Sequence, residues 1–177
     1  MLTTNFGDSP MNLFSEPPCC YLHRQATFIR LFIEKSNPDL VPMEDYDVFV
    51  FPAIYEQFGT PLVGSGDLIS VFKDSPGGRR FIAYLASSEA QEIWSRKTGK
   101  LGVNKKLDVS LYKDPVIARA AEIMRDARVF RFDGSDLMPA AVGSGAFWKG
   151  VLDYISGEEL GKVLRRIEES ADYAYGE

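Results

Sequence analysis

The sequence is poor in two side chains on which much metal and redox chemistry depends. It holds one histidine, His23, and two cysteines, the adjacent Cys19 and Cys20. Neighbouring cysteines can join only in a strained eight-membered ring, so we expect no structural disulfide between them. A metal site built on these three residues would need further ligands, and we find no second cluster to supply them. We therefore predict no metal site, no cofactor, and two thiols that are buried or idle.

Long apolar runs and basic stripes are also missing. No stretch approaches the ~20 apolar residues that cross a bilayer. The first residues, Met1–Asp8, have neither a cationic start nor an apolar core, so we expect no signal peptide in this chain. The formal net charge is −5, from 20 Lys and Arg against 25 Asp and Glu. Because phosphate neutralisation needs clustered cations, we expect no nucleic-acid partner.

The residues that are present suit one globular domain. A chain of 177 residues that is 45% hydrophobic is long enough to bury a core without disulfides. Aromatic side chains are plentiful, at 12 Phe, 8 Tyr and 2 Trp. Flat rings serve a core and also serve sugar sites, so this count favours neither use.

Apolar periodicity and capping residues predict more helix than strand. Helices are expected over residues 21–35, from Ser75 and Pro76, from Ser88 to Gly99, from Asp114 and Pro115, over residues 141–155, and after a capping box at Ser156. Strands are expected at residues 46–51 and within 61–72, where Gly64-Ser65-Gly66 interrupts the segment. Two or three strands cannot cover the apolar faces of so many helices. We predict an incomplete α/β fold whose further sheet partners lie on other sequence.

Several motifs occur in an order and spacing that resemble one family. In chain order they are Glu16-Pro17-Pro18, Cys20-Tyr21-Leu22-His23-Arg24-Gln25, Pro61-Leu62-Val63-Gly64-Ser65-Gly66-Asp67-Leu68, Phe81-Ile82-Ala83-Tyr84-Leu85-Ala86-Ser87, Glu89-Ala90-Gln91-Glu92-Ile93-Trp94, Tyr112-Lys113-Asp114-Pro115, Phe132-Asp133-Gly134-Ser135-Asp136-Leu137-Met138-Pro139 and Gly145-Ala146-Phe147-Trp148-Lys149-Gly150. Together they resemble the extracellular solute-binding proteins, family 1, of bacterial ABC importers, in the alpha-glucoside and maltose-binding branch. The resemblance covers essentially the whole chain. Cys19 stands where the family pattern has glycine.

This resemblance implies a fold of the periplasmic-binding-protein-like II kind. Family members are more than twice as long, so residues 1–177 would be the C-terminal portion, without the N-terminal lobe. The implied function is non-catalytic carbohydrate binding, of the alpha-glucoside type, in an ABC importer. The implied partners are a sugar or oligosaccharide and the membrane permease, and the implied location is periplasmic or extracellular, at the membrane. Apolar surface left without its lobe should also make this chain a homo-oligomer.

The resemblance further implies a sugar cleft between two lobes, with this chain forming one wall. Trp148 is expected to stack on the sugar, since aromatic rings pack on the apolar C–H faces of sugar rings. Tyr21 would lie near the cleft, and the carboxylate of Asp67 would accept sugar hydroxyls. The predicted substrate-binding residues are Trp148, Tyr21, Asp67, Gly66, Phe147 and Asp136.

The main candidate residues also have structural interpretations. Trp148 could be a core ring, Tyr21 a surface or hinge tyrosine, and Asp67 a turn residue that bonds its own backbone. Ser135 or Asp136 would first serve as a cap for the short turn that follows.

Two other functional classes stay open. Asp67 and Asp136 could serve a small glycoside-active enzyme domain, and Asp133 with Asp136 could form an acid–base pair. The sequence contains no activated nucleophile, metal cluster or cofactor motif to favour an enzyme, and we predict that it is not one. The third class is a self-associating interaction module that uses unpaired strands and apolar helix faces.

Overall fold

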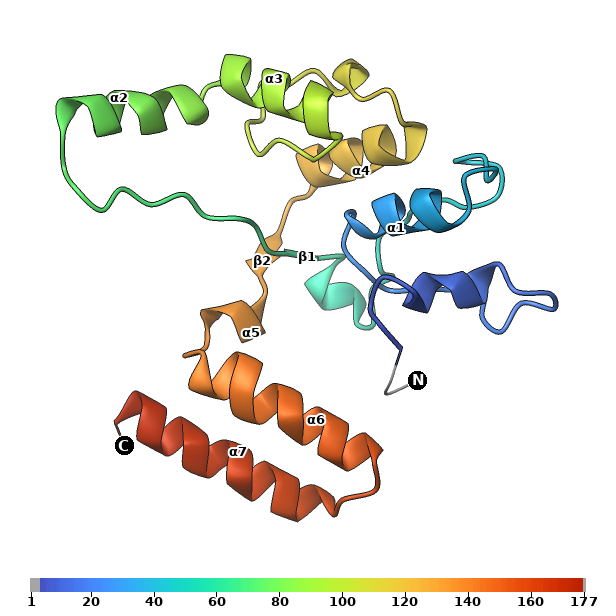
Figure 1. Cartoon of the computed structure of the whole chain (residues 1–177), viewed down its shortest axis with the longest axis vertical. Coiled ribbons are helices and arrows are strands. Elements are labelled where there is room, and N and C mark those ends of the chain that lie inside the picture. Colours follow the sequence, from blue (N-terminus) through green and yellow to red (C-terminus); the bar gives the residue numbers. More distant parts are fainter. Residues whose placement is uncertain (1–3, 177) are drawn as a thin grey trace. The chain divides into compact units, whose positions relative to one another are not determined.

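The computed structural model describes residues 4–176, and helices predominate in it (Figure 1). The α-helices are α1 (Ile29–Ser36), α2 (Pro76–Leu85), α3 (Ser88–Thr98), α4 (Pro115–Asp126), α5 (Gly134–Leu137), α6 (Trp148–Ile155) and α7 (Leu160–Tyr175). Short 3-10 helices are η1 (Ser9–Leu13), η2 (Glu56–Phe58) and η3 (Val109–Leu111), and a π-helix, η4 (Ala141–Phe147), leads directly into α6. Strands β1 (Leu62–Gly64) and β2 (Phe130–Phe132) form a two-stranded sheet. The predicted α/β class, rich in helix with a small sheet, is confirmed.

The described chain divides into two compact units. One consists of Val63–Gly66 and residues 130–176, and the other of residues 4–62 and Asp67–Val129. Strands β1 and β2 run parallel, and the N–H of Asp133, just after β2, donates to the carbonyl oxygen of Gly64 at 2.9 Å. The carboxyl ends of both strands therefore lie at the same edge of the sheet.

Helices α6 and α7 of the first unit form a hairpin that depends on a glycine. A Cβ atom at Gly150 of α6 would lie 2.8 Å from Cδ1 of Ile167 and 3.0 Å from Cγ1 of Val163, both on α7. Val163 is 2% exposed. The missing side chain thus lets the two helices approach closely enough to bury Val163.

Helix α7 begins three residues later than the predicted capping box. Its cap is Glu159, whose carboxylate accepts from the N–H groups of Gly161 at 2.7 Å and Lys162 at 2.8 Å. Ser156 instead ends α6, and its hydroxyl donates to the carbonyl oxygen of Leu152 at 2.7 Å. The predicted cap at Ser156 is wrong because Gly157, at φ 104°, still belongs to the turn between the helices.

The core of the second unit is formed by residues of α4 and of the segment just before it. Its buried members are Leu111, Tyr112, Ile117 and Ala121. Asp114 caps α4 as predicted, with one carboxylate oxygen accepting from the N–H groups of Val116 at 2.8 Å and Ile117 at 3.0 Å. Its other oxygen pairs with the guanidinium of Arg30 on α1, so this largely buried carboxylate also ties α1 to the core.

Two other helices follow their sequence signals closely. Ser75 caps α2, with Pro76 in the first turn, and its hydroxyl oxygen accepts from the N–H of Gly78 at 3.0 Å. α3 ends at Gly99, whose φ of 67° suits glycine, as predicted. The cap of α3 is Ser87 rather than Ser88, because Ser87 is the residue with extended backbone before the first turn.

The predicted strand at residues 46–51 and the first half of the helix predicted over residues 21–35 are wrong, because neither segment packs against a partner that would stabilise it. Residues 46–51 form no strand, and Phe49 and Phe51 in this segment are exposed. Within residues 4–176, β1 and β2 are the strands that pair, and strand propensity depends on packing against such a partner. Residues 21–28 are not helical, because helices depend mostly on burying an apolar face, and Leu22 has nothing to cover it.

Candidate functional site

The aromatic pair Phe147 and Trp148 lies where the π-helix η4 becomes the α-helix α6. Trp148 is 64% exposed and Phe147 is 42% exposed, so neither ring belongs to the core of this unit. π-helical turns occur frequently at functional sites, because the extra residue in the turn changes the direction of the side chains around it. The structure thus presents both predicted aromatic residues on an open surface.

A glycine explains how η4 fits against α5. A Cβ atom at Gly143 would overlap the carbonyl oxygen of Ser135 and lie 3.3 Å from Cβ of Met138. Only glycine permits this approach of the two backbones. The predicted glycine-loosened start of the helix over residues 141–155 is thus confirmed as η4, and it brings the segment that carries Phe147 and Trp148 against α5.

A hydroxyl and a carboxylate meet at the carboxyl ends of the parallel strands. Ser65 follows β1, and its hydroxyl donates to the carboxylate of Asp136 in α5, which follows β2. Gly66 beside them is open, with no atom within 4 Å of the position of a Cβ. Ligands in open α/β sheets usually bind outside this edge of the strands. The structure therefore brings Gly66 and Asp136 together with Ser65, which the sequence analysis had not chosen.

The cap of α5 differs from the predicted one. Asp133 precedes the first helical residue, and its carboxylate accepts from the N–H of Ser135 at 3.0 Å and from the Ser135 hydroxyl at 2.7 Å. The prediction that Ser135 or Asp136 caps this turn is wrong, because a cap must have extended backbone just before the helix. Asp136 is thereby left to accept from Ser65.

Asp67 belongs to the second unit and has a cation beside it. Its carboxylate lies 3.6 Å from Nζ of Lys100, and the same Nζ lies 5.9 Å from the centroid of the Trp94 ring. Lys100 directly follows Gly99, whose left-handed backbone ends α3 and turns the chain back beside Trp94. The sequence analysis missed Lys100 as a neighbour of Asp67, and the glycine cap was a signal only for the return of Lys100 to Trp94.

Tyr21 also belongs to the second unit, in a segment without helix or strand. Its side chain is 83% exposed. Its predicted place beside the sugar, together with Trp148 of the first unit, stays a prediction.

Two curated proteins match nearly the whole chain. The osmoprotective compounds-binding protein GgtB of Synechocystis sp. is 44% identical over 169 residues, which are 96% of this chain and 39% of that protein. The alpha-glucosides-binding periplasmic protein AglE of Rhizobium meliloti is 41% identical over 173 residues, which are 96% of this chain and 37% of that protein. This chain is a relative of these binding proteins. The family resemblance predicted from the motifs is confirmed.

The chain spans less than two fifths of the length of either relative. No family model matches it, and no solved structure does. Among residues 4–176, no helix combines the length and the apolar character needed to cross a membrane. Within the same residues, no three or more His, Cys, Asp or Glu side chains gather where they could hold a metal ion.

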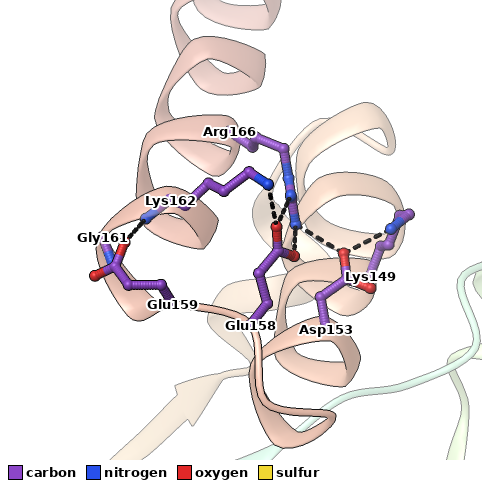
Figure 2. A network of polar contacts seen from close by, with 7 residues as sticks. All are labelled: Lys149, Asp153, Glu158, Glu159, Gly161, Lys162 and Arg166. Carbon is purple, nitrogen blue, oxygen red and sulfur yellow. Dashed lines mark hydrogen bonds and ion pairs between the residues drawn. The ribbon is translucent and has the colours of Figure 1, made fainter.

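An ion network joins α7 to the helix that carries Trp148 (Figure 2). The guanidinium of Arg166 on α7 donates to both carboxylate oxygens of Glu158, at 2.6 and 2.7 Å, and to Asp153 of α6 at 2.7 Å. Lys149, next to Trp148, donates to the same Asp153 carboxylate at 2.6 Å. Lys162 lies 3.1 Å from Glu158. The network joins α6, the interhelical turn and α7.

We expect the same network to make the stability of the hairpin sensitive to acid. The two nitrogens of Arg166, and then Lys162, lower the pKa of Glu158 from 4.5 to about 2. A lowered folded-state pKa stabilises the fold fully above pH 4.5, and this stabilisation is lost as the pH falls towards 2. We expect the thermal midpoint followed by circular dichroism to fall less between pH 5 and 2 in Glu158→Gln than in the natural chain. Glu169→Gln, on an exposed part of α7, is the control, and equal acid sensitivity of all three proteins would contradict the expectation.

Proposed function

We propose that this chain forms one wall of the sugar site in a carbohydrate-binding component of an ABC importer. The observation that carries the proposal is the exposed pair Phe147 and Trp148, in the unit whose parallel strand ends hold Ser65 and Asp136. Aromatic faces together with hydroxyl and carboxylate groups are the two kinds of contact that a sugar ring needs. The name of one relative, an alpha-glucosides-binding protein, supports a carbohydrate ligand, and the name of the other, an osmoprotective compounds-binding protein, supports a binding function.

In this proposal each group has a distinct task. The Trp148 ring stacks on the apolar face of a sugar, and Phe147 limits the space beside it. The Asp136 carboxylate accepts from sugar hydroxyls, and Ser65, which donates to it, holds it in place. The open backbone at Gly66 lets a sugar approach without meeting a side chain. None of these tasks breaks a bond, so the component is non-catalytic.

The proposal extends to the complete protein. Its fold is of the periplasmic-binding-protein-like II kind, and residues 1–177 are its C-terminal portion. An N-terminal lobe provides the opposite wall of the cleft, and Tyr21 and Asp67 contact the sugar when the lobes close. Closure is the signal that the permease reads at the membrane, because the ligand touches both lobes only in the closed form. One relative is named as periplasmic, which supports the same location here.

The test separates binding from turnover. The complete protein is titrated with alpha-glucosides, maltodextrins and osmoprotective compounds by calorimetry, and it is incubated with aryl alpha-glucosides to detect release of the aryl group. We expect saturable binding and no release above the buffer rate. Release that disappears in Asp136→Asn or Asp67→Asn would instead establish the enzyme alternative. Absence of binding to every sugar would overturn the proposal.

The chain by itself is expected to self-associate. Large apolar side chains such as Leu22, Leu68 and Phe72 are mostly exposed. Exposed apolar patches of several hundred Å² usually find a partner. We expect light scattering on residues 1–177 to report dimers or larger species whose share grows with concentration. A monodisperse monomer at high concentration would contradict this.

A further inference from the structure

The adjacent thiols of Cys19 and Cys20 are not used by the proposed sugar site. Both are free, Cys19 is exposed, and Cys20 is partly exposed. Adjacent Cα atoms are ~3.8 Å apart across a trans peptide, below the ~4.4 Å minimum usual for disulfides. A direct S–S bond between these residues would therefore be strained and easily reduced. A larger atom inserted between the two sulfurs would relieve that strain, because it enlarges the ring by one member.

The backbone at this pair is curled rather than extended. The N–H of Cys19 donates to the carbonyl oxygen of Asn12 at 3.0 Å, and the N–H of Cys20 donates to the same oxygen at 3.4 Å. In an extended strand successive N–H groups and successive side chains point in opposite directions. Two consecutive N–H groups that converge on one acceptor exclude that arrangement. The backbone therefore does not force the two thiols to opposite sides of the chain.

A serine hydroxyl holds the loop in this shape. The Ser15 oxygen accepts from the N–H of Cys19 at 3.0 Å, and its hydroxyl lies within donating distance of the carbonyl oxygens of Asn12, at 3.1 Å, and Pro17, at 3.0 Å. Ser15 thus joins the acceptor at Asn12 to the first cysteine. The loop is restrained before any ligand arrives, which lowers the cost of ordering the two thiols on binding.

We propose that Cys19 and Cys20 form a dithiol site for a single thiophilic atom, such as trivalent arsenic or a soft metal cation. Thiolates are the side chains that select soft metals. His23 does not complete a three-ligand site, since no such group exists among residues 4–176. The site is therefore a two-sulfur one, suited to an atom that takes two protein ligands. The proposal does not depend on the sugar function.

The chemistry needs no oxidant. With phenylarsine oxide, two S–H bonds break and two As–S bonds form, while the oxygen leaves as water with both thiol protons. Arsenic stays trivalent and both sulfurs keep their oxidation state. A single thiol can form only one such bond, and excess monothiol reverses it. When both thiols lie in one loop, the second thiol has a high effective concentration at the arsenic once the first bond has formed. This raises the affinity by about 10² to 10⁴ over that of a single thiol.

The experiment titrates residues 1–177 with phenylarsine oxide in the presence of excess monothiol. Intact mass spectrometry measures retention, and circular dichroism checks that each variant is folded. We expect one phenylarsine per chain, removed by excess dithiol, and about 100-fold weaker retention in both Cys19→Ser and Cys20→Ser. Ser15→Ala, which keeps both thiols, is expected to retain it more weakly than the natural chain. The proposal is overturned if the natural chain fails to retain the probe, if either single-cysteine variant retains it equally well, or if Ser15→Ala changes nothing.

Discussion

Replacing Trp148 by alanine in the complete binding protein is expected to lower sugar affinity about 100-fold, or ~3 kcal/mol. The indole is 64% exposed, so its removal leaves no cavity in the core of its unit. The affinity would be lost because the indole face no longer contacts the sugar. Water that takes the place of the indole interacts less favourably with the apolar face of the sugar ring. Calorimetry on the natural and substituted proteins measures the difference directly.

The second tryptophan provides the matched control. Trp94 lies on α3, is 54% exposed and has Lys100 above its ring. Trp94→Ala makes the same substitution at a tryptophan of similar exposure outside the proposed stacking site, so we expect affinity within a factor of a few of the natural protein. If Trp148→Ala binds sugar as tightly as the natural protein, Trp148 is not the stacking residue. If Trp94→Ala has the larger effect, the site lies at Asp67 and Lys100 instead.

The features of this fold that could be predicted from the sequence are those that depend on interactions between residues close together in the chain. Ser75, Asp114 and Gly99 each act on backbone groups at most three or four positions away, so a capping signal suffices to find them. Where two candidates compete locally, as Ser87 does with Ser88, the choice depends on which residue has extended backbone. The backbone conformation of Ser87 depends on how the surrounding chain packs, so the predicted start of α3 is one residue too late.

The parts that could not be predicted depend on residues far apart in the chain. Ser65 and Asp136 are brought together by the parallel pairing of β1 with β2, and no local signal marks Ser65 as the donor. The expected strand at residues 46–51 has the right composition, yet among residues 4–176 it forms no more than an isolated bridge, between Tyr46 and Pro42. The glycine-rich start of the helix over residues 141–155 was visible in the sequence. The position of this helix start against α5 could not be predicted, because it depends on the close approach of Gly143 to the carbonyl oxygen of Ser135.

Residues 1–177 alone are expected to bind sugar at least 1000-fold more weakly than the complete protein. In our proposal the sugar contacts two walls, and this chain supplies one of them. Removing one wall removes its contacts, but the cost of immobilising the sugar remains. At ~1.4 kcal/mol for each tenfold change, the loss of several hydrogen bonds moves micromolar affinity to millimolar or weaker. The remaining contacts would come from Trp148, Phe147 and Asp136.

Calorimetry at micromolar sugar should therefore detect no heat of binding for residues 1–177. Circular dichroism on the same sample must show folded helices, so that a negative result reflects the missing wall rather than an unfolded chain. Supplying the remaining part of the complete protein in trans should restore binding, and Trp148→Ala in residues 1–177 should abolish that restoration. Micromolar binding by residues 1–177 alone would mean that one wall is sufficient, and the two-wall site would have to be abandoned. Binding by the remaining part alone, unchanged when this chain is added, would move the sugar site off these residues altogether.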